Sequence, residues 1–427
     1  MEDLTTRTSR HALLRSDHQI LAIVILLVCI SILAVYSTSG VMAYIKKNGD
    51  TSFYIMHHSG TLLIGIAAMA IFYLIPSHTL SLLSSVCMAG AIGLLLLTPI
   101  FGLNENEAIR RISLIGFTFQ TSDAAKVAVA IFLARQLSVK RKSLGDWRTV
   151  FRIFLPVLIA VALIFPFNFS TAALLFASAL TVMYFGQVRF WHLCKIAGVA
   201  GGLAVLFIGL ALLCHTAGIK NPVIDKVTHR VETWVNRVER FGGSTQDEEA
   251  EDTSLTTDYQ AIQAELAIAT GGFTGKGIGH STLRYALPHP YSDFIYAITI
   301  EETGIMGGLA VLALYIWFFF RVKRIVKRCD RTFPAFLAIG LAVNILYQAF
   351  MHMGVAVGVF PVTGQTLPFV SMGGSSLLFT GMSFGIILRI SREVERRKEK
   401  SLQESTGNEP VAGLDPIPNV EYEQASV

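Results

Sequence analysis

The sequence predicts an all-α integral membrane protein with about ten transmembrane helices and both termini in the cytoplasm. Three observations support this fold class. Of the 427 residues, 52% are hydrophobic and only 15% are charged, and the mean hydropathy is +0.55. Apolar runs of roughly 20 residues, the length that spans a bilayer, recur along the chain. Lysine and arginine gather in alternate connections between these runs, which is typical of cytoplasmic loops.

The apolar runs give the expected helices in order. The first run is longer than the apolar core of a signal peptide, so we expect it to be a retained helix. The fourth and fifth runs are short, so a count of eight or nine helices stays open. The expected helices cover residues 19–40, 59–75, 80–101, 122–137, 150–165, 170–187, 193–214, 291–321, 333–357 and 374–390.

The charges between these helices predict their orientation. Both termini and the even-numbered connections carry basic clusters such as "SVKRKSLGDWR" and "RVKRIVKRCDR", whereas a long loop at about 215–290 contains the acidic run "TQDEEAED". Lysine and arginine mark the cytoplasmic side, so the long loop lies outside. The net charge of +5 reflects these inner flanks and gives no ground for a nucleic-acid partner.

Three segments follow from this division. Residues 1–18 form a cytoplasmic N-terminal segment, and residues 19–390 form one polytopic membrane domain that includes the long outer loop. Residues 391–427 become polar and rich in Pro and Glu, and we expect a disordered cytoplasmic tail there.

Cysteine and histidine give no sign of a metal site. The five cysteines are scattered, and no pair has metal or redox spacing. His57 and His58 are adjacent, and His352 lies alone between two methionines, so neither arrangement has the i,i+4 geometry of helical metal ligands. We interpret these histidines as packing or interfacial residues.

A first polar cluster precedes the fourth helix, in the stretch "NEAIRRISLIGFTFQTSDAAK" at 106–126. We expect an amphipathic outer loop here, and on a helix Arg110 and Arg111 would diverge by about 100°. Asp123 and Lys126 have i,i+3 spacing and can form an ion pair that makes the lysine tolerable in the membrane. Alternatively, the arginines and the lysine form a cationic site for a phosphate or diphosphate.

Two further clusters contain irregular sequence. The stretch "GGFTGKGIG" at 271–279 lacks the spacing of a phosphate-binding P-loop, and we expect a glycine-bent re-entrant or interfacial loop. The stretch "GVFPVTGQTLPFVSMGGSSLL" at 358–378 interrupts apolar sequence before the last helix. It either lines a cavity or simply begins a helix with serine caps.

The fourth cluster, "LPHPYSDFIYAITIEETG" at 287–304, brings carboxylates to the start of the eighth helix. Ser292 or Asp293 could cap that helix, or Asp293 could be a general base facing an outer cavity. On a continuous helix Glu302 would lie on the opposite face, roughly 13.5 Å from Asp293 along the axis. The two cannot form a close carboxylate pair, so Asp293 would act alone and Glu302 would be a buried structural partner to a cation.

These four clusters, in this order, resemble the SEDS family of peptidoglycan polymerases over residues 15–395. The segments that carry the resemblance are "NEAIRRI…FQTSDAAK", "GGFTGKGIG", "LPHPYSDFIYAITIEETG" and "GQTLPFVSMGGSS". The resemblance implies a SEDS-type fold with ten helices and a large outer loop between helices seven and eight. Two departures concern His289, where the family has Glu, and the end of helix five, where only Asn168 and Thr171 of the family pattern remain.

The resemblance also implies an activity. Family members polymerise lipid II into β-1,4 glycan strands at the outer face of the cytoplasmic membrane, and Asp293 occupies the position of the catalytic aspartate. The implied accessory residues are Glu302, Asp123 and His289. Substrate binding would fall to Arg110, Arg111, Gln120, Lys126, Arg230, Lys276, Ser371 and Ser375. A divalent cation, Mg²⁺ or Mn²⁺, would help to neutralise the diphosphate through ligands that stay unknown, and no organic cofactor is expected.

The implied partners are a class B penicillin-binding transpeptidase and other division or elongation proteins. The motif "GQTLP" favours the FtsW-type division branch at the septum of a bacterial inner membrane, whereas "PVTG" favours the RodA-type elongation branch. Two other functions stay open. A lipid II flippase would carry charges well inside several helices, and a non-catalytic division scaffold would tolerate replacement of Asp293.

Overall fold

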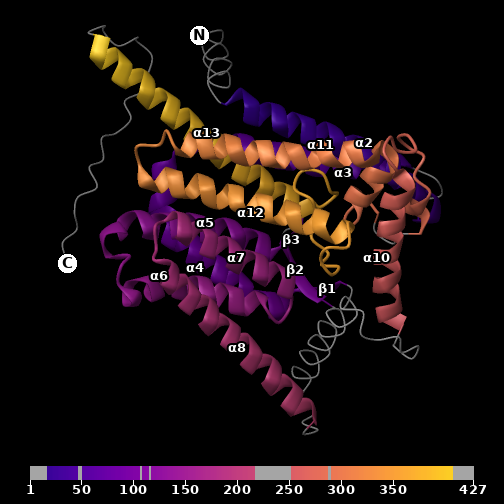
Figure 1. Ribbon diagram of the computed structural model, residues 1–427, viewed down its shortest axis with the longest axis horizontal. Coiled ribbons are helices and arrows are strands. Elements are labelled where there is room, and N and C mark those ends of the chain that lie inside the picture. The colour runs from indigo at the N-terminus through magenta and orange to yellow at the C-terminus, as the bar shows by residue number, and fades with distance from the viewer. Residues whose placement is uncertain are drawn as a thin grey trace.

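The computed structural model describes residues 17–46, 51–105, 108–114, 117–216, 252–286 and 290–406. It is a bundle of helices whose long axes run in roughly the same direction (Figure 1). All ten expected helices are present. They are α2 (His18–Lys46), α3 (Thr51–Leu74), α4 (Ser77–Phe101), α5 (Thr121–Val139), α6 (Trp147–Ile164), α7 (Phe169–Phe185), α8 (Phe190–Thr216), α11 (Ile295–Val326), α12 (Thr332–Ala356) and α13 (Gly374–Thr406).

The predicted membrane-spanning character is confirmed. Eight of the described helices are long and apolar enough to cross a bilayer, and α7 is a shorter apolar helix. The tenth, α5, has 19 residues and carries polar side chains at positions that the bundle buries. The two short runs of the sequence, α5 and α6, are therefore both helices of the bundle, and the count of ten is met among the described residues.

Capping residues fix the start of two of these helices. The carboxylate of Asp146 accepts hydrogen bonds from the backbone N–H groups of Arg148 and Thr149 and thereby caps α6. The side chain of Asn168 accepts a hydrogen bond of 3.2 Å from the backbone N–H of Thr171 and caps α7. Asn168 and Thr171, the remnants of the family pattern after helix five, thus define where α7 begins.

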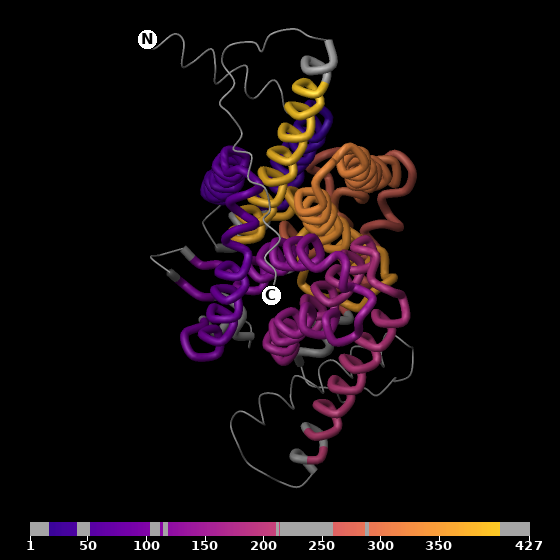
Figure 2. Tube along the Cα trace, turned by 90° about the vertical axis from the view of Figure 1, so that its left-hand side faces the viewer, coloured from indigo at the N-terminus to yellow at the C-terminus, as the bar shows by residue number. Residues whose placement is uncertain are grey.

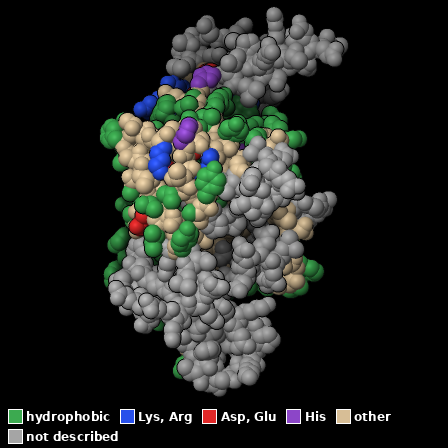
Figure 3. All heavy atoms as spheres, turned by 90° about the vertical axis from the view of Figure 1, so that its right-hand side faces the viewer, with side chains coloured by type: hydrophobic (Ala, Val, Ile, Leu, Met, Phe, Trp, Pro, Cys, Tyr) green, Lys and Arg blue, Asp and Glu red, His purple; other side chains and the backbone are tan. Residues whose placement is uncertain are grey.

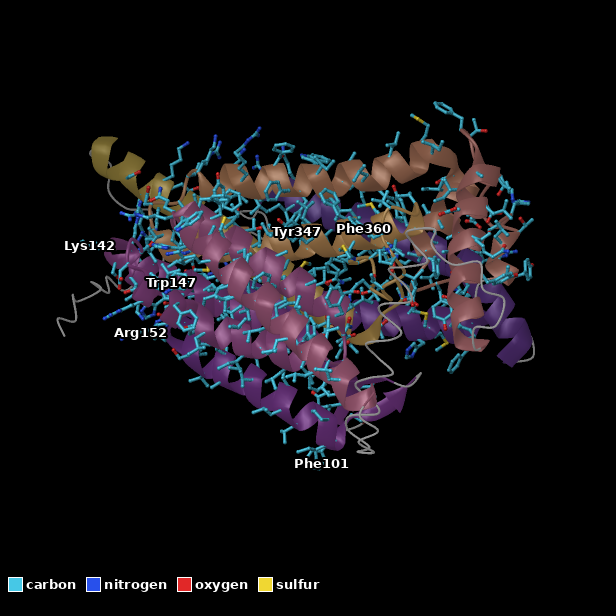
Figure 4. The ribbon with its side chains drawn as sticks, turned by 60° about the horizontal axis from the view of Figure 1, so that its bottom comes forward. Phe101, Lys142, Trp147, Arg152, Tyr347 and Phe360 are labelled. Atoms are coloured by element: carbon cyan, nitrogen blue, oxygen red, sulfur yellow. The ribbon has the colours of Figure 1, made fainter. Side chains whose placement is uncertain are left out.

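Basic residues lie at one end of the bundle, which we call the basic end. It comprises the turn Arg141–Ser143, the α11–α12 connection at 327–331 and the last turns of α13. The start of α2 lies at the same end (Figure 1), and Lys142 and Arg152 mark it in Figure 4, whereas Phe101 and Phe360 lie toward the opposite end. The positive-inside rule assigns the basic end to the cytoplasm, and we call the opposite end the outer end.

The first polar cluster is a small sheet rather than an amphipathic helix or loop. Strands β1 (Leu103–Glu105), β2 (Ala108–Leu114) and β3 (Phe117–Gln120) pair antiparallel in the order β1-β2-β3. In this register Arg111 lies opposite Gln120, and Leu114 lies opposite Phe117. Arg110 and Arg111 are therefore neighbours on a strand, and the divergence of about 100° that a helix would give them does not apply. The alternating aromatic and polar residues of "FTFQ" favour a strand, because one face of a strand packs while the other stays polar.

One expectation for the outer loop is met and two features of the chain were not predicted. The glycine-bent loop expected at 271–279 is present, with positive φ at Gly272, Gly275, Gly277 and Gly279. It is preceded by a helix that we did not predict, α10 (Asp252–Gly271). It lies across the ends of the spanning helices (Figure 1), and its buried Ala264 and Ala267 belong to the same core as α11. Helix α13 runs on to Thr406, so the prediction of a tail from 391 is wrong for 391–406, while 407–427 lie outside the described residues.

The bundle has two hydrophobic cores. One is built mainly from α2, α3, α11, α12 and α13, with contributions from α5 and α10. The other is built mainly from α4, α5, α6, α7 and α8. In the end-on view of Figure 2 the orange helices α11 and α12 lie above the magenta α6 to α8. Helix α12 packs against members of both cores, including α5, α7 and α11. Residues on its faces can therefore connect the two halves of the molecule.

Close helix contact fixes the position of α13. A Cβ added at Gly381 would collide with the backbone carbonyl of Gly65 on α3, and one at Gly385 would collide with that of Met69. Glycine is needed at these positions because only it lets two helix backbones approach so closely. This contact holds the start of α13, with Ser375, at the outer end beside β3.

Candidate active site

Asp293 lies in a turn that precedes α11. The helix begins at Ile295, and its N-cap residue is Phe294, without a side-chain capping bond. The carboxylate of Asp293 accepts a hydrogen bond from the hydroxyl of Ser292, with 2.8 Å between Oδ1 and Oγ. The side chain of Asp293 is only partly buried. The interpretation of Ser292 or Asp293 as a helix cap is therefore wrong, and a partly exposed carboxylate is available at the outer end.

The backbone before Asp293 is held by two buried side chains. The carbonyl of Ser292 accepts a hydrogen bond from Ser371 Oγ at 2.7 Å and another from His352 Nε2 at 3.1 Å. The N–H of Met372 donates to the carbonyl of Tyr291 at 3.0 Å. Because the side chains of Ser371 and His352 are almost fully buried, they clamp the turn rather than face solvent. His352 is buried, as expected for a packing residue, and in addition it holds the backbone beside Asp293.

Lys126 lies at the centre of a second buried network. Its ammonium is 2.8 Å from the carboxylate of Asp123, so the predicted i,i+3 ion pair is confirmed. The same ammonium donates to Gln348 Oε1 at 2.8 Å, and Gln348 Nε2 donates to the carbonyl of Thr366 at 2.9 Å. Lys126 is 7% exposed. Its charge is compensated locally, and it is fixed in place by groups from α5, α12 and the loop before α13.

Helix α12 and the loop 357–373 join the two networks. Gln348 and His352 are four residues apart on α12, which is about 6 Å along a helix axis. Gln348 holds Lys126 and Thr366, while His352 holds the turn of Asp293. A Cβ added at Gly364, two residues before Thr366, would lie 3.6 Å from Asp293 Oδ2. One short stretch of loop therefore runs from the carboxylate of Asp293 to the network of Lys126.

These connecting residues had a signal in the sequence that our prediction did not use. Asn344, Gln348 and His352 recur every four residues in an otherwise apolar helix, and such spacing places polar groups on one helix face. Asn344 Nδ2 donates to the backbone carbonyl of Lys126 at 3.2 Å. This polar line on α12 faces the site over its whole length.

Gln120 and Ser375, both predicted to bind substrate, lie together. The backbone N–H of Gln120, at the end of β3, donates to Ser375 Oγ at 3.1 Å, and its side-chain amide donates to Ser122 Oγ at 2.8 Å. Beside them is a hollow with an empty volume of about 300 Å³. Its walls combine amides and hydroxyls with apolar side chains, and the lining residues are Leu95, Thr98, Gln120, Thr121, Ser122, Leu163, Ile164, Phe167 and Asn168.

The start of α7 is tied to the same loop. Gln365 Nε2 donates to Thr171 Oγ1 at 2.6 Å, and both side chains are buried. Gln365 lies between Gly364, beside Asp293, and Thr366, beside Gln348. The loop 357–373 therefore contacts α7, α11 and α12 within a few residues, which gives the site a fixed backbone frame.

Four predicted residues cannot be placed at the level of their side chains. Arg230 and His289 lie outside the described residues. Arg110 and Arg111 are described only as positions on β2. The pairing of Arg111 with Gln120 puts its backbone beside the Gln120–Ser375 contact. Their predicted roles stay predictions.

Lys276 belongs to a different cluster, together with Glu301. The Glu301 carboxylate is fully buried and accepts hydrogen bonds from four donors: Lys276 Nζ at 2.6 Å, the backbone and hydroxyl of Thr282 at 3.0 and 2.9 Å, and the hydroxyl of Ser281. The ammonium of Lys276 is therefore paired with Glu301, whereas the cation that acts electrostatically on Glu302 is Arg284. The role of Lys276 in substrate binding stays a prediction, and its ammonium is already engaged here.

Glu302 fastens the outer loop to α2. Its carboxylate accepts hydrogen bonds from the hydroxyl of Ser37 and from the backbone N–H of Ser281. The chain breaks its helical course directly afterwards, because Gly304 has φ 75° and ψ 179°. A Cβ added at Gly304 or at Gly275 would collide with the backbone of the facing segment, so both positions require glycine. The segment 271–282 thus packs closely against α11 and has a structural role.

The described residues offer no protein cage for a metal ion, since they contain no group of three or more His, Cys, Asp or Glu side chains close enough to share one. Figure 3 looks onto the outer end of the molecule. Basic and histidine side chains are scattered there among hydrophobic and neutral ones, and acidic side chains are few on the visible described surface.

The fold and the site define a multi-pass membrane protein with a buried polar site at the outer end of its bundle. The family profile of FtsW, RodA and SpoVE, described as "Cell cycle protein", matches residues 17–396. The chain belongs to this family. The predicted membership and fold class are confirmed.

Individual relatives agree with this assignment. The chain is 31% identical over 358 residues to "Probable peptidoglycan glycosyltransferase FtsW" of Nitrosococcus halophilus (strain Nc4), covering 82% of this chain and 85% of the relative. It is 30% identical over 385 residues to "Stage V sporulation protein E" of Bacillus subtilis (strain 168), covering 88% and 97%.

Two solved structures share the fold. One, described as "Structural coordination of polymerization and crosslinking by a peptidoglycan synthase complex", has a TM-score of 0.65 at 21% identity and covers 89% of this chain and 98% of its own. The other, the crystal structure of the rod shape determining protein RodA of Thermus thermophilus, has a TM-score of 0.61 at 20% identity and covers 88% and 97%.

Proposed function

We propose that the protein is a peptidoglycan glycosyltransferase that polymerises lipid II into β-1,4 glycan strands at the outer face of the membrane. The observation that carries this proposal is the joint placement of Asp293 and Lys126. A partly exposed carboxylate and a fixed ammonium are connected by the loop 363–366 and by one turn of α12. Two relatives' names, a peptidoglycan glycosyltransferase and a sporulation protein, agree with cell-wall synthesis.

Asp293 is the general base in this proposal. Its carboxylate takes the proton of the 4-hydroxyl of the acceptor N-acetylglucosamine as that oxygen attacks C1 of the donor N-acetylmuramic acid. The bond between C1 and the diphosphate oxygen breaks, and the diphosphate leaves with the bonding electrons. Attack from the face opposite the leaving group inverts C1 and gives the β-1,4 linkage. The clamp of His352 and Ser371 keeps the base in a fixed position, which general-base catalysis requires.

A single carboxylate carries this chemistry. Glu301 accepts four hydrogen bonds, and Glu302 accepts hydrogen bonds from Ser37 and Ser281 where the outer loop meets α2 and α11. We therefore assign both carboxylates a structural role. An inverting transfer needs only one base, because the leaving diphosphate requires no protonation at neutral pH.

Positive charge has to balance the departing diphosphate. Lys126, held by Gln348, is the described cation nearest to the loop beside Asp293 in the hydrogen-bond network, and we assign it this role together with Arg110, Arg111 and Arg230. A divalent cation, Mg²⁺ or Mn²⁺, belongs to the proposal as a counter-ion. Because the described residues form no cage for it, we expect it to be held mainly by the diphosphate itself.

The proposal extends to partner and place. A solved structure of similar fold is described as a peptidoglycan synthase complex that coordinates polymerization and crosslinking. We infer a class B penicillin-binding transpeptidase as the partner here, with other division proteins, in the cytoplasmic membrane at the septum. The relatives named FtsW favour division over a RodA-type role in elongation.

The test is polymerisation of labelled lipid II by the purified full chain, with Mg²⁺, Mn²⁺ or a chelator, and with and without its cognate transpeptidase. Asp293→Asn removes the base and keeps its shape. Asp146→Asn is the matched control, because Asp146 is exposed at the basic end and asparagine caps a helix equally well.

Glycan strands from the wild type and the control, and none from folded Asp293→Asn, support the polymerase. Equal product from all three removes Asp293 from the mechanism. No product from the wild type with its partner overturns the proposal. Lipid II translocation in vesicles would then test the flippase, and loss of division without loss of any lipid II activity would indicate the scaffold.

A further inference from the structure

Two hollows lie side by side at the basic end, far along the bundle from Asp293. They are formed by the end of α11, the connection 327–331 and α13. Their empty volumes, which include the open solvent at their mouths, are about 300 and 340 Å³. Arg328 and Val394 line both of them, so the two hollows adjoin across one arginine.

Basic side chains dominate the lining of this pair of hollows. The four acidic residues in the lining are Asp17, Asp330, Glu393 and Glu395. Two of them are already neutralised, Asp17 by Arg321 at 2.5 Å and Glu393 by Arg389 at 2.9 Å. The six basic residues in the lining are Arg321, Arg324, Arg328, Arg331, Arg397 and Lys398.

Five of these six basic residues, all except Arg321, have no ion pair within the described part of the chain. Only Asp330 and Glu395 remain to oppose them. The thiol of Cys329, which lines one of the two hollows, adds no negative charge, because burial together with Asp330 and Glu393 raises its pKa to about 12. The lining of the two hollows therefore carries a surplus of positive charge, since its basic residues outnumber its acidic ones.

Topology alone does not require this arrangement. The positive-inside rule is satisfied by basic residues anywhere in a cytoplasmic loop, as in the exposed turn that contains Arg141 and Lys142. Here the arginines come from three separate elements and converge on shared hollows. The lining also includes the apolar side chains of Ile325, Pro334 and Ile390. Convergent cations with an apolar wall are what a ligand with a charged head and an apolar body needs.

We propose that this pair of hollows binds the headgroup of an anionic phospholipid that carries two phosphate groups, one in each hollow, as in cardiolipin. Arginine suits this ligand because its planar guanidinium holds phosphate oxygens in pairs. The site lies at the cytoplasmic ends of the spanning helices, where inner-leaflet headgroups sit, and basic pockets between helices on this side recognise such lipids.

The expected consequence of lipid binding is higher stability of the basic end. The lining joins the start of α2 through Asp17, the end of α11, the α11–α12 connection and α13, so a lipid with two phosphates would link elements that are far apart in the chain. Since the ligand binds only the folded protein, it raises the unfolding temperature. The proposal concerns a separate site and does not depend on the glycosyltransferase activity.

The experiment uses the purified full chain, delipidated and placed in phosphatidylcholine nanodiscs. Cardiolipin, phosphatidylglycerol at equal phosphate, and soluble inorganic diphosphate are titrated separately, and bound lipid is counted by native mass spectrometry. Arg328→Gln with Arg331→Gln removes one shared and one adjacent cation. Arg141→Gln with Lys142→Gln is the control, because it removes the same charge from an exposed turn on the same side.

We expect cardiolipin to bind more tightly than phosphatidylglycerol, and the Arg328/Arg331 variant to lose affinity by about fivefold for each charge removed, while the control stays within a factor of two. Equal losses in both variants would reduce the effect to general surface charge. Equal affinity for phosphatidylglycerol would overturn the two-phosphate site, and saturation by free diphosphate would replace the lipid by a small anion. Unfolding of both variants in phosphatidylcholine alone checks that they remain folded.

Discussion

Two loops pack at the outer end of α11, one beside Glu301 and one beside Asp293. The two carboxylates differ in how many hydrogen-bond donors surround them. The segment 271–282 surrounds Glu301 with four hydrogen-bond donors and leaves it fully buried. The loop 357–373, through Ser371, and His352 of α12 hold the backbone before Asp293. Among the described residues, the Asp293 carboxylate itself accepts a hydrogen bond from the hydroxyl of its neighbour Ser292 alone. Glu301 is fully engaged in structural hydrogen bonds, whereas Asp293 is held in position with a carboxylate oxygen available to a substrate.

The number of hydrogen bonds that a carboxylate accepts can therefore distinguish a structural acid from a catalytic one, even when the two are close together in the sequence. A saturated carboxylate has no lone pair left for a substrate proton, and its removal costs folding free energy. A carboxylate with a fixed backbone and an open oxygen can accept a substrate proton, and its removal costs little folding free energy. Replacing Asp293 should therefore lower activity, and replacing Glu301 should lower stability.

The largest expected effect is that of Asp293→Asn. It should lower the rate of polymerisation by about 1,000-fold, since it removes a general base without changing shape, and it should leave the unfolding temperature almost unchanged. Single-turnover formation of labelled glycan, beside a thermal melt, measures both. Retained activity would show that Asp293, like Glu301, is a structural acid, and the proposed difference between the two carboxylates would be wrong.

The next effect separates the two interpretations of Lys126. In the double variant Asp123→Asn with Lys126→Gln both charges disappear, so no buried charge is left unpaired. If the ion pair is only structural, this variant folds and polymerises normally. We expect a folded protein whose rate is lower by about 100-fold, because a preorganised cation at the leaving group is missing. The single variant Lys126→Gln, which strands Asp123, should in addition be less stable.

A smaller effect is expected at His352, which acts through the backbone of Ser292 and is a positioning residue. His352→Ala should lower kcat by about tenfold with little change in KM, since substrate contacts remain while the base becomes mobile. His352→Gln should restore most of the rate, because its side-chain amide can donate to the same carbonyl. Equal activity of both variants, or a change confined to KM, would argue against the clamp.

The smallest effect on activity is expected at Glu301. Glu301→Gln should change the rate per folded molecule by less than twofold, whereas it should lower the free energy of unfolding by about 2 kcal/mol, a value reduced from that of a fully buried pair because Lys276 is partly exposed. Glu265→Gln, an exposed glutamate on neighbouring α10, serves as the control. Chemical denaturation measures the difference. A large loss of rate without loss of stability would indicate that Glu301 belongs to the active site.

The spanning helices were predictable because each carries its own signal. An apolar run of sufficient length has to be helical in a bilayer, where every backbone group must be satisfied internally. Even α5 and α6, the shortest runs, are helices. The sheet β1–β3, the helix α10 and the break at Gly304 were not predicted, since short elements outside the apolar runs take their conformation from what they pack against.

The candidate site was predictable in part. Local spacing identified the ion pair of Asp123 and Lys126, which the structure confirms. It also identified Asp293 as an unusual acid, but it could not exclude the helix cap. It did not identify Glu301 as the partner of Lys276, because two adjacent glutamates look alike in a sequence.

The sequence by itself determined the membrane class, the order and direction of the spanning helices, and the four polar clusters, because hydrophobic length and charge bias act locally along the chain. Only the tertiary structure decided which clusters share a site. It brought the turn of Asp293, the network of Lys126 and the loop before α13 together through Gln348 and His352 of α12. It separated Lys276 and Glu302 from them. Contacts between residues more than 200 positions apart depend on how helices pack, and no local pattern records that packing.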